Sequence, residues 1–501
     1  MKASKLFLIL AVLFISAQLV NAQIISANDG GWNQTATWVG GVVPGSSDNV
    51  VIDHTVTLDV TDAVCNDLTL NNKLRFAIDG TVSGITVNGN IIINSGGLLR
   101  VESLSASGAF VEHTMNLKGD LTNNGTLDFR GGSNGSGTSN GVLLTLEGTT
   151  NSTVSLINTT YSSSNEEFNS ITINKSGGAK VILASGNLFM SNNASTGGVV
   201  LTLTDGIIET GSNQWVLLRT GSSGIVGGSD NSYVNGILGR GVSNGGGQVE
   251  IDFPVGEGMK YRPISFSFDA PANSTGHYFW VQMISGNANT GSSTFTGGIN
   301  KVSELRYYEA GYLQNNGSAS AESVFQISPT YSTDDSVIAG NQDLRVAYSL
   351  DNRTTWNGAG PTDHTTDLTN VPTTIASDSL NPNISIPTGS SIFISLAYAT
   401  GGVNPVTLEG SSIVDRWYLD QNYPNPFNPS TIIKYGMPSQ SNVRLIVYNI
   451  IGEVVTELVN EIQSPGNYSV KWDASNVNSG VYFIKIKADN FVSIKKMLLI
   501  K

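Results

Sequence analysis

Short apolar runs alternate with polar turns along most of this chain, and the alternation predicts β-strands. Val50-Val51-Ile52, Val56-Thr57-Leu58 and Leu68-Thr69-Leu70 open the series, and each run is followed by Asp or Asn. β-Branched residues favour strands, whereas Gly and Asn favour tight turns. The pattern therefore predicts an all-β protein with short strands.

A short phrase recurs between residues 23 and 240. Gly89-Asn90-Ile91 returns thirty residues later as Gly119-Asp120-Leu121, and a third copy is Gly186-Asn187-Leu188. Irregular repeats of short strands with polar corners are typical of a β-solenoid, in which each repeat forms one rung. We therefore predict a β-solenoid, similar to a parallel β-helix, over 23–240. A pair of β-sandwiches would give the same signals and is the alternative.

The pattern changes near residue 240, where aromatic residues become frequent. Ile264-Ser265-Phe266-Ser267-Phe268 and Leu344-Arg345-Val346-Ala347-Tyr348 alternate strictly between apolar and less apolar positions. Such alternation is typical of half-buried antiparallel strands. We predict a β-sandwich over 241–400 and a linker over 401–415.

The last segment begins with a proline-rich lead. Pro424, Pro426 and Pro429 fall within six residues, so the lead cannot lie inside a strand ladder. We expect Tyr423 and Phe427 to be buried and to hold the lead against the following domain. The strand alternation that follows predicts a compact Ig-like sandwich over 416–501.

These residues closely resemble the C-terminal sorting domain of type IX secretion systems, also called Por secretion. The positions that carry the resemblance are Asn422, Tyr423, Pro424, Asn425, Pro426, Phe427, Asn428, Pro429, Gly452, Gly480, Val481, Tyr482, Lys495 and Lys496. The resemblance implies recognition by the outer-membrane secretion machinery and removal of the domain by a sortase-like peptidase. The remaining passenger would then be released or attached to surface lipopolysaccharide. An ordinary terminal Ig-like domain is the alternative.

The first 22 residues have the pattern of a secretory signal peptide. Lys2 and Lys5 precede an apolar run from Leu6 to Val20, which is short for a membrane span. Val20-Asn21-Ala22 places small residues at a cleavage site, although an uncleaved anchor is the alternative. We expect no transmembrane segment in the mature chain. After Sec export through the periplasm, we expect the protein to be extracellular or on the cell surface, at the exterior of the outer membrane.

The charge is unevenly distributed along the chain. The formal net charge is −13, or −15 without Lys2 and Lys5. Residues 413–501 hold nine basic and seven acidic residues, which leaves about −17 for 23–412. An acidic surface repels phosphate backbones, so nucleic acid is not expected as a partner. The single cysteine, Cys65, cannot form an intramolecular disulfide and is expected to be buried as a small apolar residue.

No motif for a metal or a cofactor is visible. The four histidines, His54, His113, His277 and His364, show no metal-binding spacing. Asp53-His54 and Asp363-His364 are adjacent pairs, which we interpret as polar loop residues. The acidic pairs Glu166-Glu167 and Asp334-Asp335 offer oxygen ligands for calcium, but solvated loops are the favoured interpretation.

Four aromatic residues of the middle region are the remaining candidates for binding. Trp280, Tyr307, Tyr308 and Trp356 would stack on sugars if they were exposed, although such residues more often fill a sandwich core. With no catalytic constellation visible, we predict a non-enzymatic, structural or adhesin-like passenger. Residues 37–58 and 168–174 loosely resemble the N-terminal regions of surface proteins exported by type IX systems, which supports the architecture but not an activity. A carbohydrate-binding module or a glycan-active enzyme with its site in 240–400 is the alternative.

Overall fold

The computed structural model describes residues 23–501 with short gaps, and the predicted signal peptide lies outside this part. The gaps are 103–109, 131–139, 161–165, 191–199, 219–223, 243–247, 270–276, 315–320, 336, 338–342, 362–363, 370, 381–382, 400–405, 409–415, 464, 476 and 490. The chain forms two compact units, and the first contains the residues up to Ile157 together with Ser162–Thr172. The second contains Asn158–Tyr161 and Ile173–Lys501.

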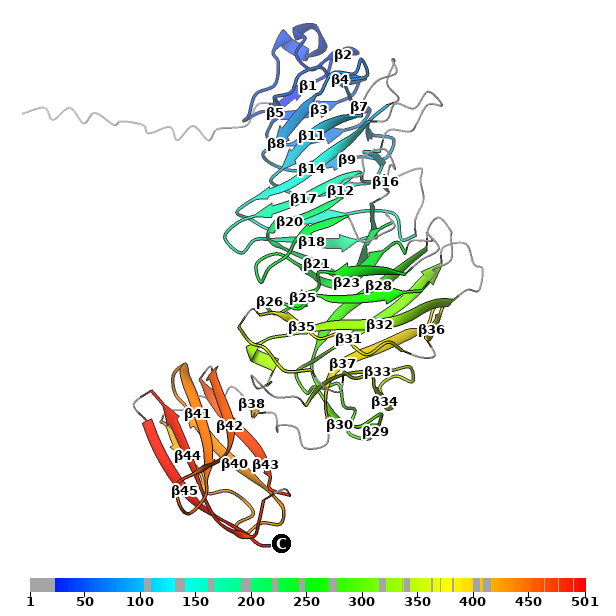
Figure 1. The fold of residues 1–501 in the computed structure, drawn as a ribbon. Coiled ribbons are helices and arrows are strands. Elements are labelled where there is room, and N and C mark those ends of the chain that lie inside the picture. The colour runs from blue at the N-terminus through cyan, green and yellow to red at the C-terminus, as the bar shows by residue number, and fades with distance from the viewer. Residues whose placement is uncertain are drawn as a thin grey trace, which may run out of the picture. The chain divides into compact units, whose positions relative to one another are not determined.

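The first unit is built from three parallel sheets (Figure 1). One sheet contains β1 (Gln23–Ile25), β3 (Asn49–Ile52), β6 (Leu68–Leu70), β9 (Ile91–Ile93), β12 (Leu121–Asn123) and β15 (Ser152–Ser155). The next contains β2 (Gly30–Gly31), β4 (Val56–Leu58), β7 (Lys73–Phe76), β10 (Leu98–Arg100), β13 (Thr126–Asp128) and β16 (Glu166–Glu167). The third contains β5 (Ala63–Cys65), β8 (Gly84–Val87), β11 (Val111–Leu117) and β14 (Asn140–Gly148). Successive rungs pair in parallel, so the solenoid prediction is confirmed and the pair of sandwiches is excluded.

Two 3-10 helices and one strand complete this part of the chain. The helices are η1 (Thr35–Thr37) and η2 (Val39–Gly41), which lie before β3. Strand β17 (Ser170–Lys175) runs across the division between the two units.

The repeated phrase of the sequence corresponds to one rung. Ile91 and Leu121, which end the first two copies, are register partners in β9 and β12. Asparagines at a corner form a ladder: Asn94 donates to Asn71, and Asn71 donates to Asp53, both at 2.7 Å. Side chains bonded from rung to rung satisfy the polar corner, which explains why Asn recurs there.

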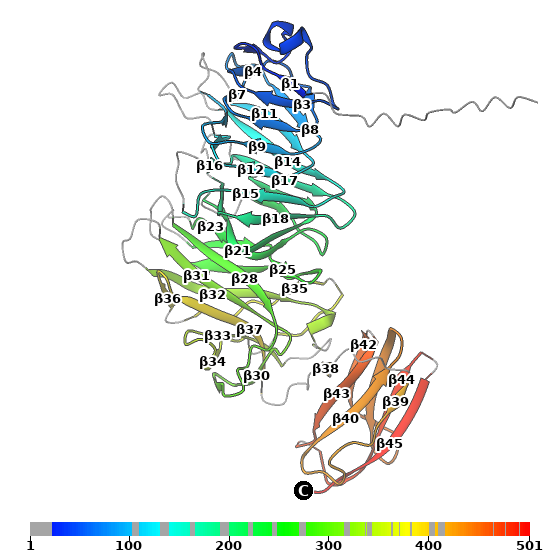
Figure 2. The same ribbon diagram turned by 180° about the vertical axis from the view of Figure 1, so that it is seen from behind.

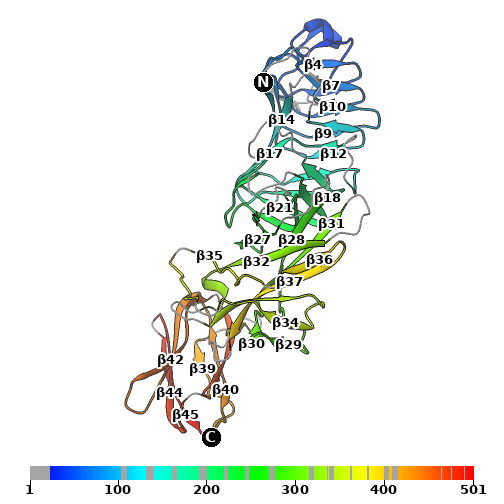
Figure 3. The ribbon, with the colours of Figure 1, turned by 45° about the vertical axis from the view of Figure 1, so that its right-hand side comes forward.

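The solenoid interior consists of stacked apolar side chains. Leu74, Leu99 and Leu127 are register partners on β7, β10 and β13, and all three are fully buried. Figure 3 shows β7 and β10 side by side. A column of aromatic rings runs parallel to them, with Phe129 6.2 Å from Phe76 and 6.0 Å from Phe168. Burial at about 25 cal/mol per Å² of apolar surface is therefore the main stabilising contribution.

In the second unit the pairing changes from parallel to antiparallel. The parallel strands are β18 (Lys180–Ser185), β19 (Leu188–Met190), β20 (Leu201–Asp205), β21 (Ile207–Leu217), β22 (Ile225–Gly227) and β23 (Val234–Arg240). Strand β23 then pairs antiparallel with β28 (His277–Ser285) (Figure 2). The predicted boundary at 240 falls at this change, and one sheet continues through it.

The region after β23 contains two facing sheets. The first continues from β28 through β31 (Arg306–Gln314), β37 (Ser391–Ala399), β33 (Leu344–Ser349), β34 (Thr355–Gly358), β29 (Thr294–Thr296) and β30 (Ile299–Val302). The second contains β24 (Val249–Phe253), β27 (Ile264–Phe268), β32 (Ala321–Tyr331), β35 (Thr373–Thr374) and β36 (Ile384–Pro387). Shorter elements are the hairpin β25 (Gly256–Glu257) with β26 (Lys260–Tyr261), and the 3-10 helix η3 (Thr333–Asp335). Phe266 of β27 lies 4.9 Å from Phe279 of β28, so aromatic side chains fill the space between the sheets.

The C-terminal residues form a second antiparallel sandwich. One sheet has the order β38 (Val406–Leu408), β43 (Gly466–Asp473), β40 (Ser430–Met437), β39 (Tyr418–Leu419). The other has the order β42 (Val454–Gln463), β41 (Ser441–Tyr448), β44 (Gly480–Ala488), β45 (Phe491–Leu499). Strand β38, which the sequence placed in the linker, pairs with β43. The all-β fold class is thus confirmed.

Candidate functional site

The proline-rich lead of the C-terminal sandwich is held by its own side chains. Asn422, 2% exposed, donates from Nδ2 to the Pro424 carbonyl at 3.1 Å and to Thr431 Oγ1 at 2.9 Å. Thr431 donates in turn to the Pro424 carbonyl at 2.8 Å. Because prolines lack the N–H groups of a ladder, these side-chain bonds replace backbone pairing in the lead.

The lead is also bonded to the last strand of the chain. The Phe427 N–H donates to the Leu498 carbonyl at 2.9 Å, and the Ile500 N–H donates to the Phe427 carbonyl at 3.0 Å. The Asn425 amide accepts from the Leu498 N–H at 2.9 Å and donates to the Lys496 carbonyl at 3.2 Å. The two ends of the sorting motif, about 70 residues apart, therefore form one structural element.

The two aromatic residues of the lead differ in their exposure to solvent. Phe427 is 2% exposed and its ring lies 5.3 Å from Trp472, as expected. Tyr423 is 81% exposed, so the expectation that it is buried is wrong. Its backbone pairs with Ile432 in both directions at 2.9 Å, which turns the side chain outward.

The other motif residues lie at turns and on the last two strands. Gly452, with φ of 84°, closes the turn after β41, where its N–H donates to the Asn449 carbonyl. Gly480 and Val481 begin β44, and Tyr482 donates from its hydroxyl to the Asn478 carbonyl at 2.6 Å. Of the remaining five motif residues, Pro426, Asn428 and Lys496 are exposed, whereas Pro429 and Lys495 are half-buried.

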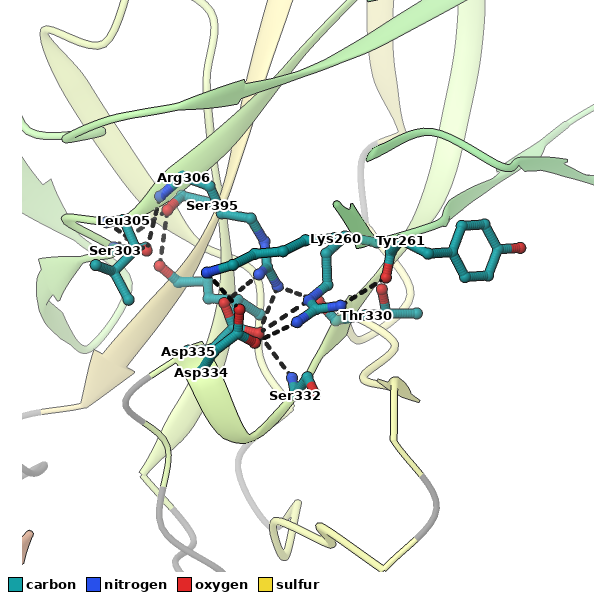
Figure 4. A network of polar contacts seen from close by, with 12 residues as sticks. Lys260, Tyr261, Ser303, Leu305, Arg306, Thr330, Ser332, Asp334, Asp335 and Ser395 are labelled. Carbon is teal, nitrogen blue, oxygen red and sulfur yellow. Dashed lines mark hydrogen bonds and ion pairs between the residues drawn. The ribbon is translucent and has the colours of Figure 1, made fainter. Parts of the chain in front are cut away.

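In the second unit, Asp334 and Asp335 lie in a network of ion pairs (Figure 4). The Asp335 carboxylate pairs with Arg306 and accepts from the Ser332 N–H at 2.6 Å. Asp334 pairs with Arg262 and with Lys260. Asp335 and the two arginines are at most 5% exposed, so the expectation of a solvated loop is wrong for Asp335.

The ion pairs outweigh burial at Arg306 and Asp334, whereas at Asp335 burial outweighs the two arginines and raises the pKa of the carboxyl. Burial alone would lower the pKa of Arg306, but Asp335 outweighs burial and raises it. Burial alone would raise the pKa of Asp334, but the hydrogen bond from Lys260 and the charge of Arg262 lower it. The two carboxylates therefore serve as counter-ions of basic side chains inside the domain.

The second acidic pair, Glu166-Glu167, is also buried, which corrects the same expectation. Glu166 is 2% exposed and accepts from Asn123 at 2.6 Å and from the Ile157 N–H at 2.9 Å. Glu167 lies 3.6 Å from Arg130. Within the described part of the chain, no group of three or more His, Cys, Asp or Glu side chains is placed to hold a metal ion.

Two of the histidines make hydrogen-bond contacts with nearby protein groups. His54 Nδ1 lies 2.9 Å from the Ser26 carbonyl, whereas Asp53 accepts from Asn71. His364 Nε2 lies 3.1 Å from the Tyr331 hydroxyl. Asp363, which precedes His364 in the sequence, and the side chain of His277 lie outside the described residues.

Because His113 is buried, we predict that the stability of the first unit depends on pH. It is fully buried, and the Ser83 N–H donates to its Nδ1 at 3.1 Å. Burial lowers the pKa of His113 to about 4, so between about pH 6.5 and 4 the unfolded chain binds one proton more. Stability should therefore decrease as the pH falls through this window, by up to about 3 kcal/mol.

Hydrogen exchange of the β8 and β11 amides at pH 7 and pH 4.5 measures this effect. His113→Gln should make protection less dependent on pH, while His54→Gln should retain the wild-type difference. An unchanged pH difference in His113→Gln would show that other groups cause it.

The aromatic candidates and the cysteine belong mainly to the interior. Trp356 and Tyr308 are 0% and 1% exposed, and Tyr307 is 9% exposed. Trp280 is half-buried and packs against a cluster that includes Phe189. A sugar-stacking surface made of all four is therefore excluded, as the core interpretation predicted. Cys65 is buried and free, and burial raises its thiol pKa.

The fold defines a modular all-β protein. It consists of a solenoid, a sandwich that shares a sheet with the last rungs, and a terminal Ig-like sandwich to which the proline-rich lead is bonded. Residues 421–501 match the secretion system C-terminal sorting domain family, so the resemblance is confirmed. This domain supports export through the type IX secretion system, and it implies interaction with that machinery and secretion to the cell surface or extracellular space. No curated protein and no solved structure matches the chain. In the described residues, no helix has the length and apolar character to cross a membrane.

Proposed function

We propose that residues 23–412 act at the cell surface as a structural, adhesin-like passenger without enzymatic activity. The observation that carries the proposal is the solenoid itself, in which stacked apolar rows such as Leu74, Leu99 and Leu127 fill the interior. The inner face of such a ladder leaves no room for a substrate, and its regular outer surface suits spacing or contact. The two acidic pairs and three of the histidines bond within the protein, which also supports the proposal.

The proposal predicts that the purified secreted protein leaves polysaccharides intact. A reducing-end assay over a broad panel of glycans should give no signal above buffer, even at micromolar protein and after overnight incubation. A commercial glycosidase mixture is the positive control for each glycan. Cleavage that increases in proportion to protein concentration would contradict the proposal and favour a glycan-active enzyme with its site in 240–400.

We further propose that a sortase-like peptidase removes the sorting domain and that the passenger is then released or attached to lipopolysaccharide. The sorting-domain match supports this, because domains of this kind act as export signals. Mass spectrometry of the surface fraction distinguishes the fates. An intact chain that still contains residues 421–501 would contradict removal.

A further inference from the structure

One outer face of the sorting domain combines basic and apolar side chains. It belongs to the sheet β42-β41-β44-β45, whose other face packs into the core through Leu445, Ile484 and Ile486. Side chains opposite each other in neighbouring strands share a face, so register defines the outer one. It contains three rows across β41, β44 and β45: Ile446-Lys485-Ile494, Arg444-Lys487-Val492 and Tyr448-Phe483-Lys496.

Apolar side chains on this face are exposed to solvent. Val492 and Ile494 of the edge strand β45 are 52% and 54% exposed. Val454, the register partner of Tyr448, is 61% exposed. Tyr448 and Phe483 lie between them and are half-buried. Large apolar side chains gathered on one exposed face indicate an interaction surface, because they gain free energy when a partner removes them from water.

The basic side chains of this face lack acidic partners. Lys485, Lys487 and Lys496 form no ion pair with any residue of the described part of the chain. Glu457 of β42 lies in register with Ile446 on the same face, but Arg444 neutralises it at 2.7 Å. The face therefore carries three positive charges that the described residues leave uncompensated.

The charge of the two parts of the chain indicates a negatively charged partner for this face. Residues 421–501 contain eight basic and five acidic residues, a balance of +3, whereas 23–412 carries about −17. An anionic surface would therefore attract the sorting domain and repel the passenger. Lysine stems pack along apolar surface while their ammonium groups reach outward, which suits a layer with phosphates above acyl chains.

From these features we propose that this face docks on an anionic phospholipid bilayer. Such a bilayer supplies mobile phosphates for Lys485, Lys487 and Lys496 and an apolar layer for Val492 and Ile494. An acidic protein would instead need carboxylates placed to match each flexible lysine. The inference goes beyond export, since the family match assigns no lipid contact to the domain.

Sedimentation of the purified chain 23–501 with vesicles tests the proposal. Vesicles of equal parts phosphatidylglycerol and phosphatidylcholine should bind it at least tenfold more tightly than vesicles of phosphatidylcholine alone, because each lysine near an anionic surface contributes about fivefold. Raising the salt from about 0.1 M to about 1 M should remove most of this difference, since the Debye length falls from about 10 Å to about 3 Å.

Two pairs of substitutions separate this face from total charge. Lys485→Gln with Lys487→Gln should weaken binding to the anionic vesicles at least tenfold. Lys434→Gln with Lys471→Gln removes the same charge from the outer face of the opposite sheet, where both lysines are exposed, and should change binding less than threefold. Thermal unfolding checks that both variants stay folded.

A third variant tests the apolar part of the face. Val492→Ser with Ile494→Ser alters two exposed side chains and should weaken binding about fivefold. The inference would be overturned by absence of vesicle binding, by equal weakening in the two lysine pairs, or by undiminished binding in the serine pair. Because these assays contain no secretion machinery, their failure would leave both the export role and the proposed passenger function intact.

Discussion

Deleting residues 416–501 should leave the passenger in the periplasm and reduce the surface fraction to background. The family match places the export signal within 421–501, and deletion removes seven of the eight strands of its sandwich. Cell fractionation with antibodies against 23–412 measures the result. If the truncated strain had the wild-type level of protein at its surface, the export signal would lie elsewhere in the chain.

The converse experiment uses the whole folded module. Strand β38 pairs with β43, so a transplanted sorting domain should begin before residue 406. Residues 401–501 fused to an unrelated periplasmic protein should carry it to the surface. A fusion that begins at 416 lacks β38 and should be exported less efficiently.

Two substitutions in the lead separate folding from recognition. Phe427→Ala removes a ring that is 2% exposed and packs on Trp472, so the domain should lose about 3–5 kcal/mol. Tyr423→Ala alters a side chain that is 81% exposed and should leave stability within about 0.5 kcal/mol. Reduced export in Tyr423→Ala with unchanged stability would identify Tyr423 as a contact of the secretion machinery.

The parts of the fold that were predictable from the sequence depend on local or periodic signals. The thirty-residue recurrence of the Gly-Asn-Ile phrase matches the register of Ile91 with Leu121, because a rung repeats both strand and corner. The sorting motif could also be predicted from the sequence, because proline and asparagine determine the conformation and hydrogen bonds of the backbone next to them. Tyr423 was misjudged because an aromatic residue in a lead can face either side, and backbone pairing with Ile432 decides between them.

Contacts between distant residues were not predictable. Asp334-Asp335 has the sequence pattern of a solvated acidic loop because its partners Arg262 and Arg306 are 72 and 29 residues away. Glu166 has a similar relation to Asn123, 43 residues away. The row of Asp252, Ser265 and Ser328 likewise exists only in the register of three strands. A single sequence contains no signal for such pairings unless a motif marks them.

Replacing Asp335 with Ala should strongly destabilise the middle sandwich. The substitution leaves Arg306 and Arg262 buried without their shared counter-ion, and breaking a buried ion pair in this way costs about 3–5 kcal/mol. At about 2–4 °C per kcal/mol for a domain of this size, the corresponding calorimetric transition should fall by roughly 6–20 °C. Hydrogen exchange of β31 and β32 would locate the loss.

Glu304→Gln is the matched control, because Glu304 forms a half-exposed pair with Lys301 at 3.3 Å and should change stability by less than about 1 kcal/mol. Asp335→Asn keeps the size of the side chain and an acceptor for the Ser332 N–H but removes the charge. If charge compensation dominates, Asp335→Asn should lose nearly as much stability as Asp335→Ala. A loss no larger than that of Glu304→Gln would instead mean that the two arginines find other acceptors, and the cluster would not be a main stabilising element of the sandwich.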